Sequence, residues 1–209
     1  SQLMLLVADP AEFPPIVQFG EVACYDVSSR LFRELVRRTI FATDNESSRY
    51  ALGGIKLEWQ ETILTAVGAD GRRLAKMEGP AQAIGNPAPI GDVTVIPSRA
   101  MQLLDRALAE DASEIQIAFR QNDILVKSPR ATIYSRLLEG RFPRWRDVFP
   151  RRERSIKLDL LVGPLQAAVR QAAIVTSEDS RGVDFTFGDG TLVLAGQTAE
   201  VGQSRVELP

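Results

Sequence analysis

The chain contains no histidine and a single cysteine, Cys24. The lack of histidine excludes a histidine-based catalytic triad, and with only one cysteine it also excludes a zinc site of the Cys/His type. One cysteine cannot build a disulfide framework within the chain, so the sequence fits a reducing compartment and we expect a cytoplasmic protein. Because Cys24 lies in the strand-like run 22–25, we expect a small buried side chain rather than a reactive thiol.

Long apolar runs and catalytic motifs are also absent. No run approaches the ~20 apolar residues that a membrane span needs, and the first residues lack the pattern of a signal peptide. The sequence holds no phosphate-cradling P-loop, no dinucleotide fingerprint and no nucleophile elbow. The loop acids at 44, 46, 178 and 179 are typical of solvated turns. We therefore expect no cofactor, no metal and no catalytic centre.

The charge is close to balanced, with 25 Lys plus Arg against 27 Asp plus Glu. Total charge therefore predicts neither nucleic acid nor an acidic membrane as a partner. Most of the cations are arginine, whose planar guanidinium suits phosphate and carboxylate groups. Their distribution along the chain is more informative than their number.

What the chain does contain is an internal repeat. A helical stretch with an arginine leads into a threonine at 36–44 and again at 169–177, so that Arg170 occupies the place of Arg37. A Phe-Pro pair precedes each of these helices, at 13–14 and at 142–143. Both markers recur after roughly 130 residues, which is the size of a domain rather than of a solenoid unit.

The repeat predicts three parts. We expect residues 1–21 to be the tail of one copy, 22–151 to be a whole copy and 152–209 to be the first half of another. Under this interpretation the chain is an excerpt of a longer protein. The middle copy is long enough to bury its own core, whereas the end pieces are not.

Alternating apolar and polar residues predict antiparallel strands, and three stretches predict helices. Asp70-Gly71 and residues 121–123 are hairpin signals between pairs of strands. The expected strands are 55–59, 63–67, 73–77, 115–119, 124–127, 131–135, 183–187 and 191–195, and the expected helices are 28–42, 98–110 and 164–176. Helices that are apolar on one side and lie on an antiparallel sheet give an α+β layer.

The sides of the first two helices away from their apolar stripes carry arginine. If both helices lie on one sheet face, these cations could form a phosphate-facing surface, although an ordinary solvated helix face has the same pattern. No aromatic residue interleaves with them, so base stacking is not expected. The arginines concerned are Arg30, Arg33, Arg37, Arg99 and Arg106.

Two further segments stand out. The segment 68–74 is either a plain hairpin turn with two cations or a functional loop. The segment 139–150 carries three arginines, a tryptophan and two phenylalanines. It is either an interdomain linker whose aromatic side chains pack on the sheet or part of a partner-binding groove, since Arg and aromatics are enriched at binding hot spots.

At these residues the chain resembles the bacterial DNA polymerase III beta subunit family, the sliding clamps. The most specific stretches are 67–75, 139–143 and 181–183, and the resemblance runs through nearly all of the 209 residues. It implies repeated α+β clamp domains with antiparallel sheets outside and two helices per domain lining the inner face. It also implies a homodimeric ring of the full-length protein around duplex DNA.

The resemblance implies site residues by position. A peptide groove between the second and third domains would use Leu52, Ala69, Gly71, Arg72, Arg73, Leu74, Pro143 and Val148. Ala69 and Arg72 stand where the family often has Thr and His, and Asp147 stands where it can have Arg. The DNA-facing positions would be Arg30, Arg33, Arg37, Arg49, Tyr50, Arg99, Arg106 and Arg170, and Glu46 departs from a neutral polar residue beside them.

The resemblance further implies a processivity subunit that is not an enzyme. Its partners would be double-stranded DNA, the replicative polymerase, the clamp loader and other proteins with a clamp-binding motif, with no membrane. Two alternatives stay open on the residues alone. One is a phosphate-processing enzyme that uses Asp70, Arg72 and Arg73, and the other is a repeat scaffold that does not bind DNA.

Overall fold

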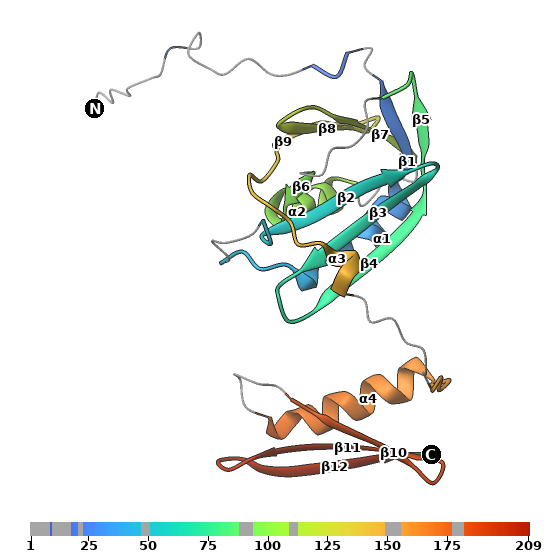
Figure 1. Ribbon diagram of the computed structural model, residues 1–209, viewed down its shortest axis with the longest axis vertical. Coiled ribbons are helices and arrows are strands. Elements are labelled where there is room, and N and C mark those ends of the chain that lie inside the picture. The colour runs from blue at the N-terminus through green and yellow to red at the C-terminus, as the bar shows by residue number, and fades with distance from the viewer. Residues whose placement is uncertain are drawn as a thin grey trace, which may run out of the picture. The chain divides into compact units, whose positions relative to one another are not determined.

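The computed structural model describes residues 9, 18–20, 23–46, 51–87, 94–108, 113–148, 156–176 and 182–209. The chain divides into two compact units, Ser1–Pro150 and Arg151–Pro209, which are described separately below (Figure 1). Within the described residues, no helix has both the length and the apolar content needed to cross a membrane.

The first unit is built on two antiparallel sheets (Figure 1). The five-stranded sheet has the order β5 (Gln82–Ile84), β1 (Cys24–Ser28), β7 (Glu114–Phe119), β8 (Asp123–Lys127) and β9 (Thr132–Arg136). The four-stranded sheet has the order β4 (Leu74–Pro80), β3 (Ile63–Ala69), β2 (Gly54–Gln60) and β6 (Val95–Pro97). Both predicted hairpins are confirmed, since Ala69 pairs with Leu74 and Phe119 pairs with Ile124.

The two long helices of this unit are shorter than the sequence predicted. Helix α1 spans Ser29–Arg37, because the Thr39 hydroxyl donates to the Leu35 carbonyl at 2.6 Å and a 3-10 turn, η2 (Ile40–Ala42), follows. Helix α2 spans Ser98–Ala107. The Ser98 hydroxyl at its start donates to the Gly53 carbonyl at 2.8 Å.

The core of the first unit lies where these helices meet both sheets. The predicted apolar stripes are confirmed, because Phe32, Leu35 and Val36 of α1 are buried, as are Met101 and Leu104 of α2 and Leu108 just after its end. Cys24 is buried too, as expected, and burial and nearby Asp26 raise the pKa of its thiol. A thiol that is deeply buried and has a raised pKa is a poor nucleophile, so Cys24 is a structural side chain of the core.

The second unit is one helix on a three-stranded antiparallel sheet (Figure 1). Helix α4 (Val162–Ala172) begins two residues before the predicted start at Pro164. It is followed directly by a 3-10 turn, η3 (Ala173–Val175). The strands are β10 (Asp184–Gly188), β11 (Thr191–Thr198) and β12 (Gly202–Leu208). Its small core joins Ala168 and Ala172 to Leu192 and Leu194.

The internal repeat is present in three dimensions. The closing pair of the β2–β3 hairpin, Gln60 with Ile63, recurs in the second unit as Gly188 with Thr191. The turn η2 at the end of α1 recurs as η3 at the end of α4. Each turn is followed by a threonine whose hydroxyl donates to a carbonyl of the turn at 2.8 Å.

A glycine sets how closely each turn approaches its sheet. A Cβ atom on Gly68 would lie 2.2 Å from the Thr39 carbonyl oxygen, and one on Gly196 would lie 2.4 Å from the Ala172 carbonyl oxygen. Both distances are shorter than any tolerable contact with backbone, so glycine is required at both positions. The two units therefore share the same close contact between helix end and central strand.

Candidate peptide groove and arginine-bearing helices

One face of the four-stranded sheet packs against the helices, and the opposite face carries charged side chains. Ile55 and Leu57 of β2 are fully buried in the core, so the alternation of a strand turns Lys56 and Glu58 to the other face. Residues 140–148, here called the linker segment, cover part of that face and end in the single turn α3 (Trp145–Val148).

An apolar cluster joins the linker segment to the sheet. It consists of Ala51, Leu52, Val67, Ala69, Val95, Phe142 and Trp145, with Leu74 and Leu138 packed against it. Phe142 and Trp145 are each only 5% exposed. Of the two interpretations of this segment, packing of these two aromatic rings on the sheet is confirmed, and neither ring is an exposed anchor for a partner.

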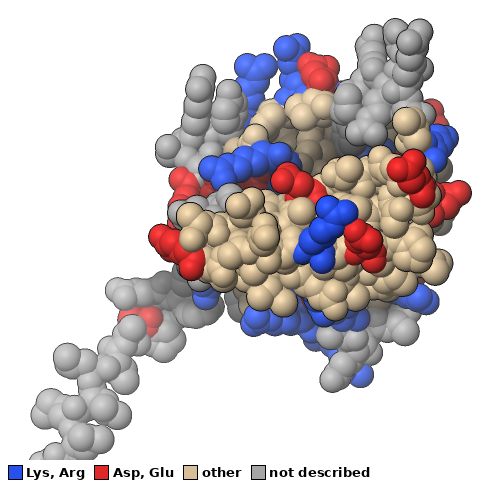
Figure 2. Space-filling model, turned by 90° about the horizontal axis from the view of Figure 1, so that it is seen from below, with Lys and Arg blue, Asp and Glu red and all other residues tan. Residues whose placement is uncertain are grey.

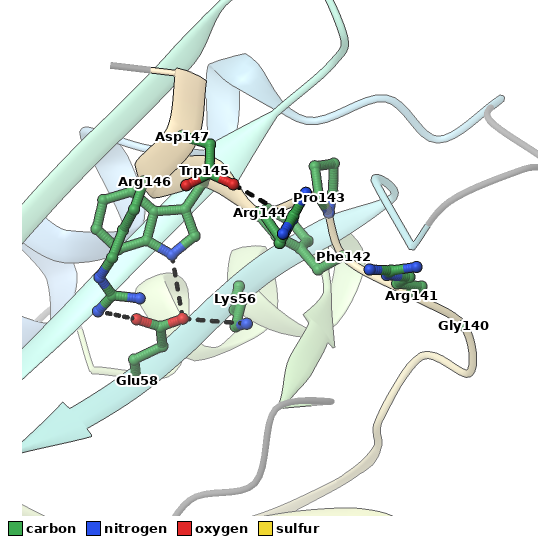
Figure 3. A pocket seen from close by; sticks show the side chains of 10 residues that line it. All are labelled: Lys56, Glu58, Gly140, Arg141, Phe142, Pro143, Arg144, Trp145, Arg146 and Asp147. Carbon is green, nitrogen blue, oxygen red and sulfur yellow. Dashed lines mark hydrogen bonds and ion pairs between the residues drawn. The ribbon is translucent and has the colours of Figure 1, made fainter. Parts of the chain in front are cut away.

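Glu58 is the polar centre of the same contact (Figure 3). Its Oε1 accepts a hydrogen bond from Trp145 Nε1 at 3.1 Å and lies 3.0 Å from Lys56 Nζ, while Oε2 lies 2.6 Å from Nη2 of Arg146. Burial opposes ionisation of Glu58, but the bonds from Arg146, Trp145 and Lys56 outweigh it and hold its pKa below the ordinary value. The ionised carboxylate is therefore the form that this site stabilises.

A pocket of about 540 Å³ opens beside this carboxylate (Figure 3). It is lined by Lys56, Glu58, Gly140, Arg141, Phe142, Pro143, Arg144, Trp145, Arg146 and Asp147. Pro143 is the member of this lining that also belongs to the predicted peptide groove.

The apolar positions predicted for the peptide groove differ in exposure, and three of them, Leu52, Ala69 and Leu74, belong to this cluster or pack against it. Leu52 and Ala69 are 5% exposed and form its floor. Leu74 and Pro143 are half-buried, and Val148 is 62% exposed. The accessible apolar surface is therefore contributed by Leu74, Pro143 and Val148.

The remaining predicted groove positions form the tight turn between β3 and β4. Gly71 has φ 85°, a conformation that favours glycine. Asp70 accepts the backbone N–H groups of Arg72 and Arg73, both at 2.9 Å, and the Nε of Arg73 at 2.7 Å. Burial alone would raise the pKa of Asp70, but these hydrogen bonds and the charge of Arg73 outweigh it and lower the pKa. The Asp70 carboxylate is therefore engaged in stabilising the turn in which it lies.

This use of Asp70 weakens the phosphate-processing alternative, which needed its carboxylate for chemistry. In the part of the chain that the structure describes, no group of three or more His, Cys, Asp or Glu side chains is placed to hold a metal ion. The side chains of Arg72 and Arg73 at this turn are exposed.

The arginine-bearing helices lie side by side, and an acidic residue joins them. Asp105 of α2 accepts hydrogen bonds from Nε of Arg33 and Nε of Arg37, both at 3.0 Å. The Arg33 side chain is only 21% exposed, against 54% for Arg37. Arg33 is thus less open to a phosphate group than its position on the helix predicted.

The other predicted DNA-facing arginines are exposed: Arg30 on α1, Arg99 and Arg106 on α2, and Arg170 on α4. Arg49 and Tyr50 lie outside the described residues. Figure 2 shows one face of the molecule, where uncharged surface dominates and charges of both signs are interspersed. This agrees with the nearly balanced total charge.

Sequence reasoning did not single out Glu58, Lys56 or Asp105. Lys56 and Glu58 alternate with buried residues, so they have the pattern of any solvent-facing side of a strand. Asp105 lies 72 residues from Arg33 in the sequence. The sole signal for Glu58 was indirect: a tryptophan in the segment 139–150, whose indole N–H needs an acceptor when it is buried.

Comparisons with known proteins point to one family. A family model described as the central domain of the DNA polymerase III beta subunit matches residues 26–144. The beta sliding clamp of Chlamydia trachomatis serovar D is 31% identical over 204 residues, which is 98% of this chain and 48% of that protein. The beta sliding clamp of Staphylococcus aureus is 25% identical over 209 residues and is covered to 54%. The chain therefore spans about half the length of the curated relatives it matches.

Solved structures agree on the fold. A sliding clamp from Pseudomonas aeruginosa bound to griselimycin superposes with a TM-score of 0.80 at 27% identity, covering 95% of this chain and 53% of that one. The DNA polymerase sliding clamp from Bacillus subtilis also gives a TM-score of 0.80, at 19% identity, over 96% of this chain and 52% of that one. At that lower identity the similarity concerns the fold alone.

Proposed function

The chain belongs to the DNA polymerase III beta subunit family, and on that premise we propose that it works as part of a sliding clamp on duplex DNA. Members of this family are processivity subunits rather than enzymes, which disfavours the catalytic alternative. The match of the family model to residues 26–144 carries the proposal. In it, residues 22–151 are the whole second clamp domain, flanked by the tail of the first and the first half of the third.

The DNA contact in this proposal is electrostatic and weak. Arg37, Arg99 and Arg106 are exposed on two neighbouring helices, and the protein as a whole is nearly neutral. A ring holds DNA by topological linkage, so a few phosphate contacts without sequence readout are sufficient and permit sliding. The full-length protein would form this ring as a homodimer.

The experiment that tests the ring is retention on DNA of different topology. Full-length protein, loaded on nicked circular duplex, should remain bound through a salt wash and dissociate once the circle is linearised. Equal retention on linear and circular duplex would contradict encirclement. No retention on either would favour the scaffold that does not bind DNA.

We also propose that Leu74, Pro143 and Val148 contact short peptide motifs of polymerase, clamp loader and other partners. The support is that these three apolar side chains are accessible and that Leu74 directly follows Arg72 and Arg73, whose side chains are exposed, in the chain. Peptides that end in leucine and phenylalanine suit such a surface, because large apolar anchors supply most of the binding energy of small interfaces. Titration of full-length protein with such a peptide tests it, and absence of saturable binding would contradict the proposal.

A further inference from the structure

Few backbone hydrogen bonds of the described residues join the linker segment to the rest of the first unit. Within the described residues, Ala51 N–H donates to the Arg141 carbonyl at 3.2 Å, at the N-terminal end of the segment. Farther along, Trp145 N–H donates to the Pro143 carbonyl and Asp147 N–H to the Arg144 carbonyl, both within the segment. A helix of four residues is too short to be stable alone. Side-chain contacts with the sheet must therefore hold its C-terminal part.

Those contacts converge on Glu58. The carboxylate, whose side chain is 18% exposed, links Lys56 of the sheet to both Trp145 and Arg146 of the linker segment. The Arg146 guanidinium carbon in turn lies 4.3 Å from the centroid of the Trp145 ring, and Lys76 Nζ lies 5.8 Å from it. Glu58 is thus the acceptor that fixes the orientation of a buried ring with cations near it.

We propose that Glu58 is a positioning residue of the peptide groove: it holds the linker segment, and with it Pro143 and Val148, on the sheet that carries Leu74. The inference rests on the proposed peptide-binding function. Pro143 precedes Trp145 by two residues and Val148 follows it by three. If the Trp145 indole leaves its place on the sheet, both of these residues are therefore displaced as well. Glu58 itself is not a contact of the peptide.

Glu58→Ala in the full-length protein is the first variant. Amide hydrogen exchange should accelerate about tenfold or more at Trp145, Asp147 and Ala51, because loss of one partner of a buried charged contact typically costs about 1.4 kcal/mol or more. The affinity for a synthetic peptide ending in leucine and phenylalanine should fall by about the same factor. The indole N–H resonance of Trp145 should shift, because it loses its acceptor.

Two further variants separate positioning from a general loss of stability. Glu58→Ala with Lys56→Met also removes the cation that the single variant leaves unpaired, so the melting temperature should recover while fast exchange and weak peptide binding persist. Glu78→Ala is the matched control: Glu78 lies on the same face of the sheet and pairs with Lys76, but its side chain is 51% exposed. It should leave exchange and affinity unchanged.

The outcomes decide two questions separately. Unchanged exchange at Trp145 and Asp147 in Glu58→Ala would overturn the positioning role, whatever the peptide does. Recovery of both protection and affinity in the double variant would also overturn it, since Glu58 would then merely neutralise Lys56. If exchange accelerates as expected but wild-type protein does not bind the peptide, the positioning of the segment stands and the proposed groove fails.

Discussion

Asp105 on α2 lies 3.0 Å from the Nε of Arg37 on α1, and the same carboxylate oxygen also accepts from Arg33. One acidic side chain therefore offsets part of the charge that two helices present. This moderates the positive charge of the two helices without removing it, as the loose hold on DNA proposed above would require. It also makes Asp105 a sensitive position for testing the DNA contact.

Asp105→Asn in full-length protein should strengthen duplex binding for all sequences alike. Freed from the carboxylate, Arg37 can reach a phosphate, and the slope of log affinity against log salt should steepen by about 0.9 for each phosphate newly neutralised. Arg37→Ala with Arg106→Ala should shift the slope the other way, whereas Arg37→Lys keeps the charge and should change it little. Fluorescence anisotropy over a salt series measures the slope. The same slope in Asp105→Asn, in the double variant and in wild type would place these side chains away from DNA.

Leu74→Ala with Val148→Ala should abolish micromolar binding of a peptide ending in leucine and phenylalanine. Truncating anchor contacts typically costs ~2 kcal/mol or more, about thirtyfold in affinity. Leu74 packs against the apolar cluster from a half-buried position and Val148 is 62% exposed, so the fold and DNA retention should be preserved. Calorimetric titration together with a melting curve checks this. Undiminished binding by a folded double variant would remove these residues from the groove.

Acid should weaken the contact made by Glu58. Its folded pKa lies below the ordinary value of 4.5, so its contribution to stability is present above pH 4.5 and is lost as the pH falls through the lowered pKa. The difference in unfolding free energy between wild type and Glu58→Gln should be largest at neutral pH and shrink below pH 4.5. Urea unfolding from pH 7 to about pH 3 gives the comparison. A difference that is constant over this range would contradict the assigned shift.

Gly68→Ala and Gly196→Ala should each destabilise the protein. The new methyl group would meet a backbone carbonyl oxygen at 2.2 Å or 2.4 Å, and overpacking of this kind typically costs about 1–3 kcal/mol. Gly163→Ala on α4 is the control, because a Cβ there meets nothing within 4 Å and alanine favours a helix. Denaturant titration ranks the three variants. Equal stability of all three variants would mean that the helix end shifts to accommodate the methyl group without loss of unfolding free energy.

The sequence was informative wherever local pattern decides structure. Hairpins around Asp70-Gly71 and the buried stripes of α1 and α2 follow from periodicity and turn chemistry, and they are present. The strands β5 and β6 have three residues each, too few to show alternation. Strand β12 was missed because most of its residues are polar or only half-buried.

The site was less predictable because its contacts are made between distant segments. Trp145 and Glu58 are 87 residues apart in sequence, and no spacing rule connects them. The same holds for Asp105 and Arg33, whose pairing makes an apparent DNA-facing arginine half-buried. Positions of single side chains could be inferred along one element, but their partners across elements could not.

The close contact at Gly68 and Gly196 also bears on how the two units can differ from each other. The connection from the helix-end turn to the first hairpin is longer in the first unit, where η2 ends at Ala42 and β2 begins at Gly54, than in the second, where η3 ends at Val175 and β10 begins at Asp184. An insertion there lengthens a connection without altering the spacing of helix and strand. Side chains elsewhere can be exchanged over evolutionary time, but a methyl group at either glycine would separate the layers. We expect relatives to differ in the length of that connection and to keep glycine at the positions of Gly68 and Gly196.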